Sequence, residues 1–517
     1  MDSLSSEALA WALTHVKKYG DTDIFPLPFE YQCIQSQAAR VVEHLSSIDL
    51  EVHETSPATR LLMLKPGFGF RVATQLDPYD CLLYLAMTYE AASAIESLRV
   101  EEAKHVACSY RVDIAPDGTL FRKQNGWPDF HARSKDLASR SDINFVVTAD
   151  IADFYYQVYH HRVQNALEAA GLTSTRSNST ERFLGSFTAK QSRGIPVGPA
   201  GSILLAEACL ADVDSFLLRK GYEHTRYVDD FRIFLPDQIS AVNALHDLTE
   251  YLHSAHRLPI QGAKTKLYST ERFTEEELVD PEESELSRLH MRLSELLNEA
   301  DLPSIYSEPE EIEITPEMEN QALRDALLSM FREVITVRPV PLGFSRYLLR
   351  RARALRTRVI LEDVLDNLDE LLPVLRDVIL YLLTVYPRNS PSTVGSALAG
   401  LLERSDYRDL PFIQSWVLYA FSVVPGFCSS HRALLFAERA RPEIRDRYGA
   451  LIARAHKVVD WVRERKEIWA NTAPWGQRAI IWAGSILPGD ERHHWLRPIK
   501  VSSNHLNAVV AIAADQP

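Results

Sequence analysis

A pair of adjacent acids between two short strand-like segments constrains this chain more than any other feature. Asp229 and Asp230 end the sequence YVDD, and β-favouring residues lie on both sides of it: Arg226, Phe231, Ile233 and Phe234. Adjacent carboxylates repel each other unless a cation lies beside them, and Mg²⁺ prefers carboxylate oxygens as ligands. Acid pairs are also common in ordinary turns, so the pair alone leaves both interpretations open.

A second group of acids favours the interpretation of Asp229 and Asp230 as metal ligands. Asp150 ends the apolar run FVVTA, and Asp153 and Tyr155 follow in the sequence DIADFYY. Phosphoryl transfer on two metal ions needs carboxylates that bridge ions about 3.5–4 Å apart. Asp150 with Asp229 and Asp230 is therefore predicted to form such a site. Asp153 has a second interpretation, as an acid that stabilises the N-terminus of a helix.

Between the two groups of acids lies the Gly- and Pro-rich sequence RGIPVGPAGS, residues 193–202, followed by the apolar helical pattern ILLAEACLADVDSFL. Glycine and proline let a backbone approach a flat partner closely. Ser202 is predicted to be the N-cap of the helix. The other interpretation is a plain junction between a loop and a helix.

The length, 517 residues, predicts two or three domains. Residues 1–280 alternate strand-like and helical patterns, 281–320 are predicted to be an acidic linker, and 321–517 show successive amphipathic helices that suggest a HEAT-like α-solenoid. The net charge of −14 is uneven. Lys and Arg number 27 against 38 Asp and Glu in 1–280, 2 against 12 in 281–320, and 27 against 20 in 321–517. The acidic average therefore hides a basic C-terminal region.

Targeting and cysteine patterns favour a cytoplasmic protein without a membrane span. The N-terminus has neither a basic region nor a small-residue cleavage site, and no apolar run is long enough to cross a bilayer. The five cysteines are scattered without a CxxC pair, which argues against disulfides and against a zinc site.

The motifs occur in a family order. TADIADFYYQVY, RGIPVGPAGSILLAEA, YVDDFRIF and PIQGAKTKLY follow one another as palm motifs A to D of reverse transcriptases do. The upstream stretches YGDTDIFPLPFEY, FRVATQLDPYDCLLYLA and SYRVD resemble the abortive-infection (Abi), defence-associated branch of that family. The resemblance covers residues 15–275. It implies an α+β right-hand polymerase palm and fingers, followed by an all-α HEAT-like repeat domain.

The resemblance also implies roles for single residues. Asp150, Asp229 and Asp230, with the backbone carbonyl of Ile151, match the ligands of two Mg²⁺ ions, or of Mn²⁺ in their place. Lys264 matches the motif D lysine that protonates pyrophosphate, or is a solvated lysine. The dNTP contacts implied are Arg71, Lys65, Asp153, Tyr155 and Ser202. Tyr155 among them matches the aromatic gate against ribonucleotides, and Arg71 is alternatively a surface ion-pair residue.

One departure from the family pattern concerns motif B, where Gly198 stands at a position that is usually serine. This variant resembles the Abi branch, in which DNA synthesis can be template-independent and primed from a protein tyrosine. Tyr19 and Tyr31, near the N-terminus, are two candidate primers among the 20 tyrosines, and the sequence does not choose among them.

The C-terminal region offers a surface for nucleic acid. Seven arginines occur without an acid between Glu333 and Glu362, and Arg346, Arg350 and Arg353 share one helical face. They are predicted to contact phosphates of DNA or RNA. The alternative is that they pair with the acidic segment 281–320, which would then be autoinhibitory.

The resemblance thus implies a Mg²⁺-dependent DNA polymerase of bacterial antiphage defence. The favoured activity is template-independent, protein-primed synthesis from dNTPs, triggered by a phage and carried out by a homo-oligomer in the bacterial cytoplasm. Templated synthesis on a partner non-coding RNA is the first alternative. A non-catalytic, nucleotide-binding phage sensor or scaffold is the second.

Overall fold

The computed structural model describes residues 2–65, 69–122, 126–188, 191–278, 321–338 and 340–516. The chain forms two compact units, each assembled from separate stretches of sequence. Unit 1 comprises Met1–Asp23, Ala39–Thr59 and Thr74–Glu285, and unit 2 comprises Ile24–Ala38, Arg60–Ala73 and Leu286–Pro517. The predicted linker 281–320 lies outside the described residues, so the predicted division there stays a prediction.

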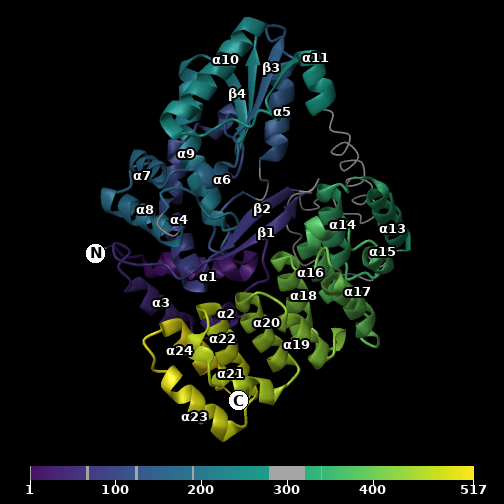
Figure 1. The fold of residues 1–517 in the computed structure, drawn as a ribbon. Coiled ribbons are helices and arrows are strands. Elements are labelled where there is room, and N and C mark those ends of the chain that lie inside the picture. Colours follow the sequence, from purple (N-terminus) through teal and green to yellow (C-terminus); the bar gives the residue numbers. More distant parts are fainter. Residues whose placement is uncertain are drawn as a thin grey trace. The chain divides into compact units, whose positions relative to one another are not determined.

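Unit 1 mixes helices and strands (Figure 1). Its helices are α1 (Ser6–Tyr19), α3 (Ala38–Ser46), α4 (Pro78–Leu98), α5 (Trp127–Ala138), α6 (Phe154–Gln157), α7 (His160–Ala169), α8 (Ser174–Phe187), α9 (Ala200–Arg219), α10 (Gln238–Tyr251) and α11 (Thr270–Phe273). Its strands are β3 (Phe145–Asp150), β4 (Glu223–Tyr227), β5 (Asp230–Leu235) and β6 (Lys266–Ser269). Single turns complete it at η1 (Glu102–Lys104), η2 (Leu252–His256) and η3 (Thr274–Leu278).

The four strands form one antiparallel sheet in the order β4-β5-β3-β6. Val146 of β3 pairs with Phe234 of β5, and these two side chains pack with Leu137 of α5 in one apolar cluster. Because side chains alternate along a strand, the next pair, Val147 and Ile233, lies on the other face. Helices α5 and α10 lie on either side of the sheet (Figure 1). The apolar runs of the sequence are therefore buried from both sides.

Unit 2 is mostly helical. Its helices are α2 (Glu30–Ser36), α13 (Gln321–Thr336), α14 (Leu342–Ala354), α15 (Leu361–Asp366), α16 (Leu375–Val385), α17 (Pro391–Glu403), α18 (Pro411–Val423), α19 (Ser430–Glu438), α20 (Pro442–Ala455), α21 (Val459–Lys466), α22 (Pro474–Ala483), α23 (Gly489–Ile499) and α24 (His505–Ala514). Short 3₁₀ turns are η5 (Leu372–Val374), η6 (Pro425–Phe427), η7 (Trp469–Asn471) and η8 (Gly484–Ile486). The small sheet β1 (Thr59–Lys65) and β2 (Gly69–Gln75) lies mainly in this unit.

The helices of unit 2 alternate between two rows. Helices α14, α16, α18, α20, α22 and α24 each pack on the next in one row (Figure 1), and α13, α17, α19, α21 and α23 each pack on the following helix of that row. Proline stands at the first or second position of several of these helices, where its missing N–H costs nothing. These features bear out the predicted α+β N-terminal part and mostly helical C-terminal region.

An N-terminal stretch belongs to the helical unit. Helix α2 packs on α24, and the indole N–H of Trp416 donates to the carbonyl of Ile24 at 3.1 Å. The carboxylate of Glu30 is fully buried, and it accepts hydrogen bonds from Arg447 at 2.8 and 2.9 Å and from Arg478 at 3.0 Å. Burial alone would raise the pKa of Glu30, but the two guanidinium groups lower it to about 2. This ion cluster therefore ties α2 to α20 and α22.

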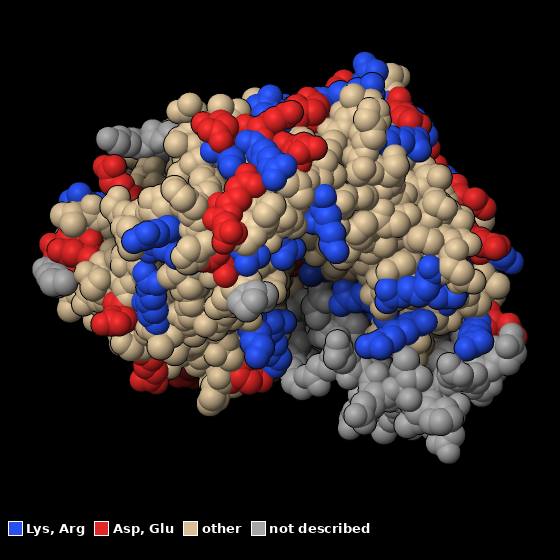
Figure 2. Space-filling model, turned by 90° about the horizontal axis from the view of Figure 1, so that it is seen from below, with Lys and Arg blue, Asp and Glu red and all other residues tan. Residues whose placement is uncertain are grey.

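Lys and Arg side chains form small groups interspersed with Asp and Glu on the face shown in Figure 2.

Within the described ranges, no helix has the length and apolar character needed to cross a membrane. The five cysteines all lie in these ranges and are buried free thiols.

Candidate active site

Three carboxylates meet at one end of the sheet. Asp150 is the last residue of β3 and Asp230 is the first of β5, and the two are partners in the antiparallel register. The N–H of Ile151 donates to the carbonyl of Asp229 at 3.2 Å, which continues the pairing by one step. Register partners carry their side chains on the same face of a sheet. The structure thus brings Asp150 together with Asp229 and Asp230, which follow it in the sequence by 79 and 80 positions.

The turn that carries Asp229 is conformationally strained. It joins β4 to β5 through only two residues, and Val228 has a φ of 52°. A β-branched residue in the left-handed region costs about 1–3 kcal/mol and persists only where its surroundings fix it. Beside the turn, the ring of Tyr227 packs edge-on against Trp127 at 5.0 Å. The backbone path at Asp229 is therefore imposed by the fold.

Electrostatics at the three acids favour a cation. Burial raises the pKa of Asp230 to about 7. The nearby guanidinium of Arg232 opposes this shift, and the charges of Asp150 and Asp229 add to it. Arg232 is itself held by stacking on Phe130 at 4.2 Å. A divalent ion would relieve the repulsion among the carboxylates, and their hard oxygen atoms suit Mg²⁺ or Mn²⁺.

Lys264 contacts this group directly. Its Nζ lies 2.6 Å from Oδ2 of Asp150, although its side chain is 64% exposed. The N–H of Gln261 donates to the carbonyl of Asp150 at 2.7 Å, and the N–H of Lys264 donates to the carbonyl of Gln261 at 3.0 Å. The loop before β6 is thus tied to the end of β3, and Lys264 is held beside Asp150.

Tyr155 lies near the same end of the sheet, on the short helix α6. Its ring packs edge-on against Phe154 at 5.5 Å, and its carbonyl accepts a hydrogen bond from the N–H of Ile195 at 2.8 Å. Burial raises the pKa of Tyr155 well above its usual value, and Tyr110 and Asp229 add smaller effects. Asp153 occupies the N-cap position of α6 with a φ of 47° and is exposed.

The backbone conformation of the glycine-rich loop explains why residue 198 is a glycine. Its φ is 135°, and a Cβ on it would lie 3.0 Å from the carbonyl oxygen of Thr74 and 3.1 Å from Cγ2 of Thr22. The N–H of Thr74 also donates to the carbonyl of Val197 at 2.9 Å. A serine at this position would therefore be both strained and crowded.

The prediction that Ser202 caps α9 is wrong. Helix α9 begins at Ala200, and Pro199 occupies its N-cap position. Ser202 is 1% exposed, and its Oγ lies 3.0 Å from the hydroxyl of Tyr84 on α4. A Cβ on Gly201 would lie 2.4 Å from Oγ1 of Thr88. This glycine lets α4 and α9 approach closely, so Ser202 packs between helices.

The remaining predicted contacts belong to unit 2. Arg71 on β2 is exposed, and Lys65 on β1 is half-buried. On α14, Arg346 and Arg350 are directed to the carboxylate of Asp377 at 3.8 and 2.9 Å. Arg353 on the same helix is half-buried. Among the tyrosines of the described ranges, Tyr19 alone has an exposed side chain, at 41%, whereas Tyr31 is buried.

A buried polar network behind the turn was not predicted from the sequence. Its members are Arg99, Ser109, Glu207, Asp214, His224 and Arg226. One signal pointed to it, because Glu207 and Asp214 stand seven positions apart in a mostly apolar helix. Buried acids need a cationic partner, and Arg226 precedes the YVDD sequence.

Comparison with known proteins agrees with the motifs. Residues 92–289 match the family model for reverse transcriptase (RNA-dependent DNA polymerase). The chain therefore carries a reverse transcriptase domain and is a nucleotidyltransferase of the reverse transcriptase type, and such domains use divalent metal ions. No curated protein matches the chain.

Solved structures with a partial likeness include telomerases. One is telomerase from Candida albicans in complex with the TWJ fragment of telomeric RNA, with 11% identity, 78% of this chain and 70% of that chain covered, and a TM-score of 0.32. Another is apo telomerase from Candida tropicalis, with 9% identity, 83% and 73% covered, and a TM-score of 0.31.

Proposed function

We propose that this protein is a Mg²⁺-dependent DNA polymerase that adds dNTPs to a hydroxyl group, with Asp150, Asp229 and Asp230 as its metal ligands. The observation that carries the proposal is the register pairing of Asp150 with Asp230 next to the strained turn at Asp229. It places three oxygen-donating side chains at one end of a rigid sheet, as two-metal chemistry requires.

In this proposal the three carboxylates and the carbonyl of Ile151 hold the ions. When bound, two Mg²⁺ ions lower the pKa of an attacking hydroxyl and neutralise charge on the triphosphate. Lys264, 2.6 Å from Asp150, holds the proton that the leaving pyrophosphate takes. Tyr155 closes the space that a 2′-hydroxyl would need. Asp153 is a further proposed dNTP contact, and Arg71 and Lys65 are candidate triphosphate-binding cations, whereas Ser202 is buried against Tyr84 and is not a direct contact.

The proposal extends to template-independent, protein-primed synthesis in bacterial antiphage defence. The motif B variant supports it, since the backbone at Gly198 disfavours the usual serine. The excess of acids in residues 1–280 supports it too. Proteins bind the phosphates of a long duplex through Lys and Arg, so an acidic N-terminal part suits synthesis without a conventional template. The exposed Tyr19 is the first tyrosine to test as primer.

The helical unit has a proposed role in holding the product. Its two rows of helices are compatible with a HEAT-like solenoid, a fold that presents extended binding surfaces. Arg346, Arg350 and Arg353 on α14 would contact phosphates of the growing strand. A homo-oligomer located in the cytoplasm completes the proposal.

The test is incubation of the purified full-length protein with Mg²⁺ and each labelled dNTP, without added nucleic acid. Label that stays with the protein after phenol extraction and appears as nucleotides on a tyrosine by mass spectrometry supports protein priming. Free labelled DNA formed only when an RNA is added favours the templated alternative. Incorporation by the Asp229→Ala, Asp230→Ala double variant equal to that of the natural protein contradicts the enzymatic proposal.

A further inference from the structure

Both peptide groups of the strained residue Val228 are held by buried side chains. Its N–H donates to Oγ of Ser109 at 2.9 Å, and its carbonyl accepts from Nη1 of Arg226 at 2.7 Å. Val228 directly precedes Asp229 in the turn. The orientation of the Asp229 backbone therefore depends on groups that lie behind the turn, inside unit 1.

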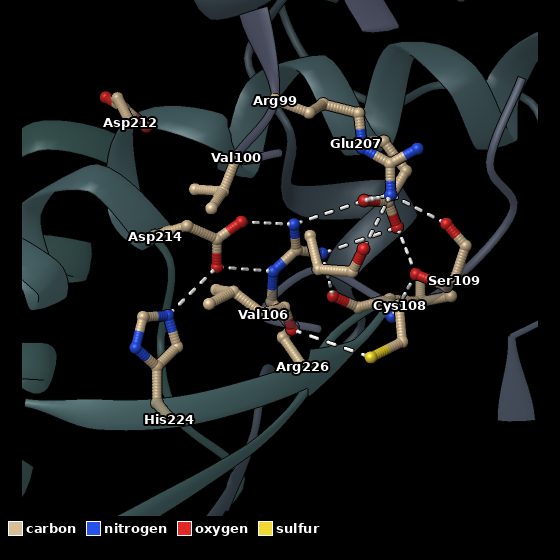
Figure 3. A network of polar contacts seen from close by, with 12 residues as sticks. Arg99, Val100, Val106, Cys108, Ser109, Glu207, Asp212, Asp214, His224 and Arg226 are labelled. Atoms are coloured by element: carbon tan, nitrogen blue, oxygen red, sulfur yellow. Dashed lines mark hydrogen bonds and ion pairs between the residues drawn. The ribbon is translucent and has the colours of Figure 1, made fainter. Parts of the chain in front are cut away.

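These two groups belong to one hydrogen-bonded network (Figure 3). The hydroxyl of Ser109 donates to Oε1 of Glu207 at 2.5 Å. The other oxygen of Glu207 accepts from Nη2 of Arg226 at 3.1 Å and lies 2.9 Å from Nη2 of Arg99. Nε and Nη2 of Arg226 also donate to the two oxygens of Asp214, at 2.9 and 2.6 Å. Helix α9, which carries both acids, is thereby connected to the turn.

The centre of the network is balanced in charge and buried. The guanidinium groups of Arg99 and Arg226 face the carboxylates of Glu207 and Asp214, and these four side chains are each 0% exposed. At its edge, Arg99 also pairs at 3.1 Å with Glu96, whose side chain is 27% exposed. Burial alone would raise the pKa of Asp214, but Arg226 and His224 lower it well below its usual range. Buried charges tolerate little displacement, since each must keep its partner. The network is thus a rigid support for the turn.

Arg226 and Arg99 also fix the position of Ser109. Arg226 exchanges backbone hydrogen bonds with Val106 and Cys108, at 2.6 and 3.0 Å. The guanidinium of Arg99 donates to the carbonyls of Ser109 and Tyr110, at 2.7 and 3.1 Å. The segment before Ser109 therefore lies along β4, and the hydroxyl is held in place from both sides.

We infer that Ser109 and Arg226 are positioning residues, which set the conformation of Val228 and thereby aim the carboxylate of Asp229 at the metal ions. The inference rests on the proposed function for its activity readout. Neither residue is catalytic, because both are shielded from solvent and substrate: Ser109 and Arg226 are each 0% exposed. The network acts on the reaction only through the turn.

The test compares Ser109→Ala with Ser109→Thr, which keeps the hydroxyl, and with Ser177→Ala, the same substitution at a fully buried serine on α8. Ser109→Ala leaves the Arg226 and Arg99 pairs of Glu207 in place, so the protein is expected to fold. We expect its kcat to fall roughly tenfold, with KM for dNTP within about twofold. We also expect Mn²⁺ to bind several-fold more weakly, as measured by electron paramagnetic resonance.

Ser109→Thr should recover most of the Mn²⁺ affinity, and Ser177→Ala should keep the natural value. The inference is overturned if Ser109→Ala binds Mn²⁺ and turns over as the natural protein does. It is also overturned if the variant only melts at a lower temperature while its affinity per folded molecule is unchanged. If the natural protein incorporates no nucleotide, the proposed function fails, whereas the Mn²⁺ affinities still decide the inference about positioning.

Discussion

Asp150 and Asp230 face each other across neighbouring antiparallel strands, one at the end of β3 and the other at the start of β5. Their position at the sheet end leaves the two side chains on one face and the turn residue Asp229 beside them. Burial of Asp230 and repulsion from the other two acids disfavour its ionised form. A cation offsets that repulsion, so the arrangement connects metal binding with the charge state of the site.

Replacing any one of these acids by the isosteric amide should abolish activity without unfolding the protein. For Asp229→Asn we expect nucleotide incorporation to fall at least about a thousandfold, because metal ions supply several kcal/mol of transition-state stabilisation. Incorporation of labelled dNTP and circular dichroism measure the two effects. Asp237→Asn, at the N-cap of α10, is the control, and it should keep full activity. Retention of more than a tenth of the activity in Asp229→Asn would exclude its role as a ligand.

Lys264→Ala should lower kcat by about 10²-fold if Lys264 supplies a proton to pyrophosphate. The matched control is Lys220→Ala, which removes another exposed lysine of unit 1 from a carboxylate, that of Asp247 at 3.2 Å. Steady-state incorporation of labelled dNTP measures kcat, and the control should keep the natural value. Equal kcat in the two variants would show that Lys264 is only a solvated ion-pair partner.

Tyr155→Val should admit ribonucleotides. Removing the ring opens space beside Asp229, and one missing group in a pocket changes discrimination by roughly 10- to 100-fold. The ratio of kcat/KM for dNTP over the matching rNTP measures the change. Tyr159→Val, at the N-cap of α7, should leave that ratio as it is.

Gly198→Ser should destabilise unit 1 by about 1–3 kcal/mol, through strain at a φ of 135° and contact with Thr74. Gly171→Ser separates the two causes. Gly171 also has a positive φ, 97°, but a Cβ there meets no heavy atom of the described chain within 4 Å. Urea unfolding should give a larger loss for Gly198→Ser. Equal losses would mean that the close contact contributes nothing.

Glu30→Gln should destabilise the helical unit by about 3–5 kcal/mol at pH 7, because it leaves two guanidinium groups without their buried carboxylate. The pKa of Glu30 is lowered on folding from its usual value of 4.5 to about 2. Its contribution is therefore complete above pH 4.5 and is lost as the pH falls toward 2. Thermal melts across this range should converge for the natural protein and the variant.

Glu491→Gln is the control for that experiment. The pKa of Glu491 is also lowered to about 2, by Arg463 and Lys466, but its side chain is 24% exposed. Near-surface pairs contribute about 1 kcal/mol or less. A loss in Glu491→Gln as large as in Glu30→Gln would show that burial is not what makes the Glu30 cluster important.

Local sequence patterns predicted the strands that carry the three acids. The apolar run before Asp150 became β3, and the segments around YVDD became β4 and β5. The N-cap prediction at Ser202 failed because α9 begins before this residue, and its hydroxyl is hydrogen-bonded to the distant Tyr84 instead. The network at Arg226 extends to Arg99, which lies 127 residues earlier in the sequence. The pattern of a single sequence does not show which distant residues contact each other. Its acids on α9 could be recognised as buried, but their partners could not be assigned.

Glu30 lies in a stretch, Ile24–Ala38, that the chain contributes to the helical unit before it has built most of unit 1. The helical unit is therefore not a terminal module that a single cut can release. A fragment of residues 321–517 lacks α2 and the carboxylate that Arg447 and Arg478 share. Completing it would require both Ile24–Ala38 and Arg60–Ala73, supplied in trans or in a permuted chain, so the two units have to be expressed and engineered together.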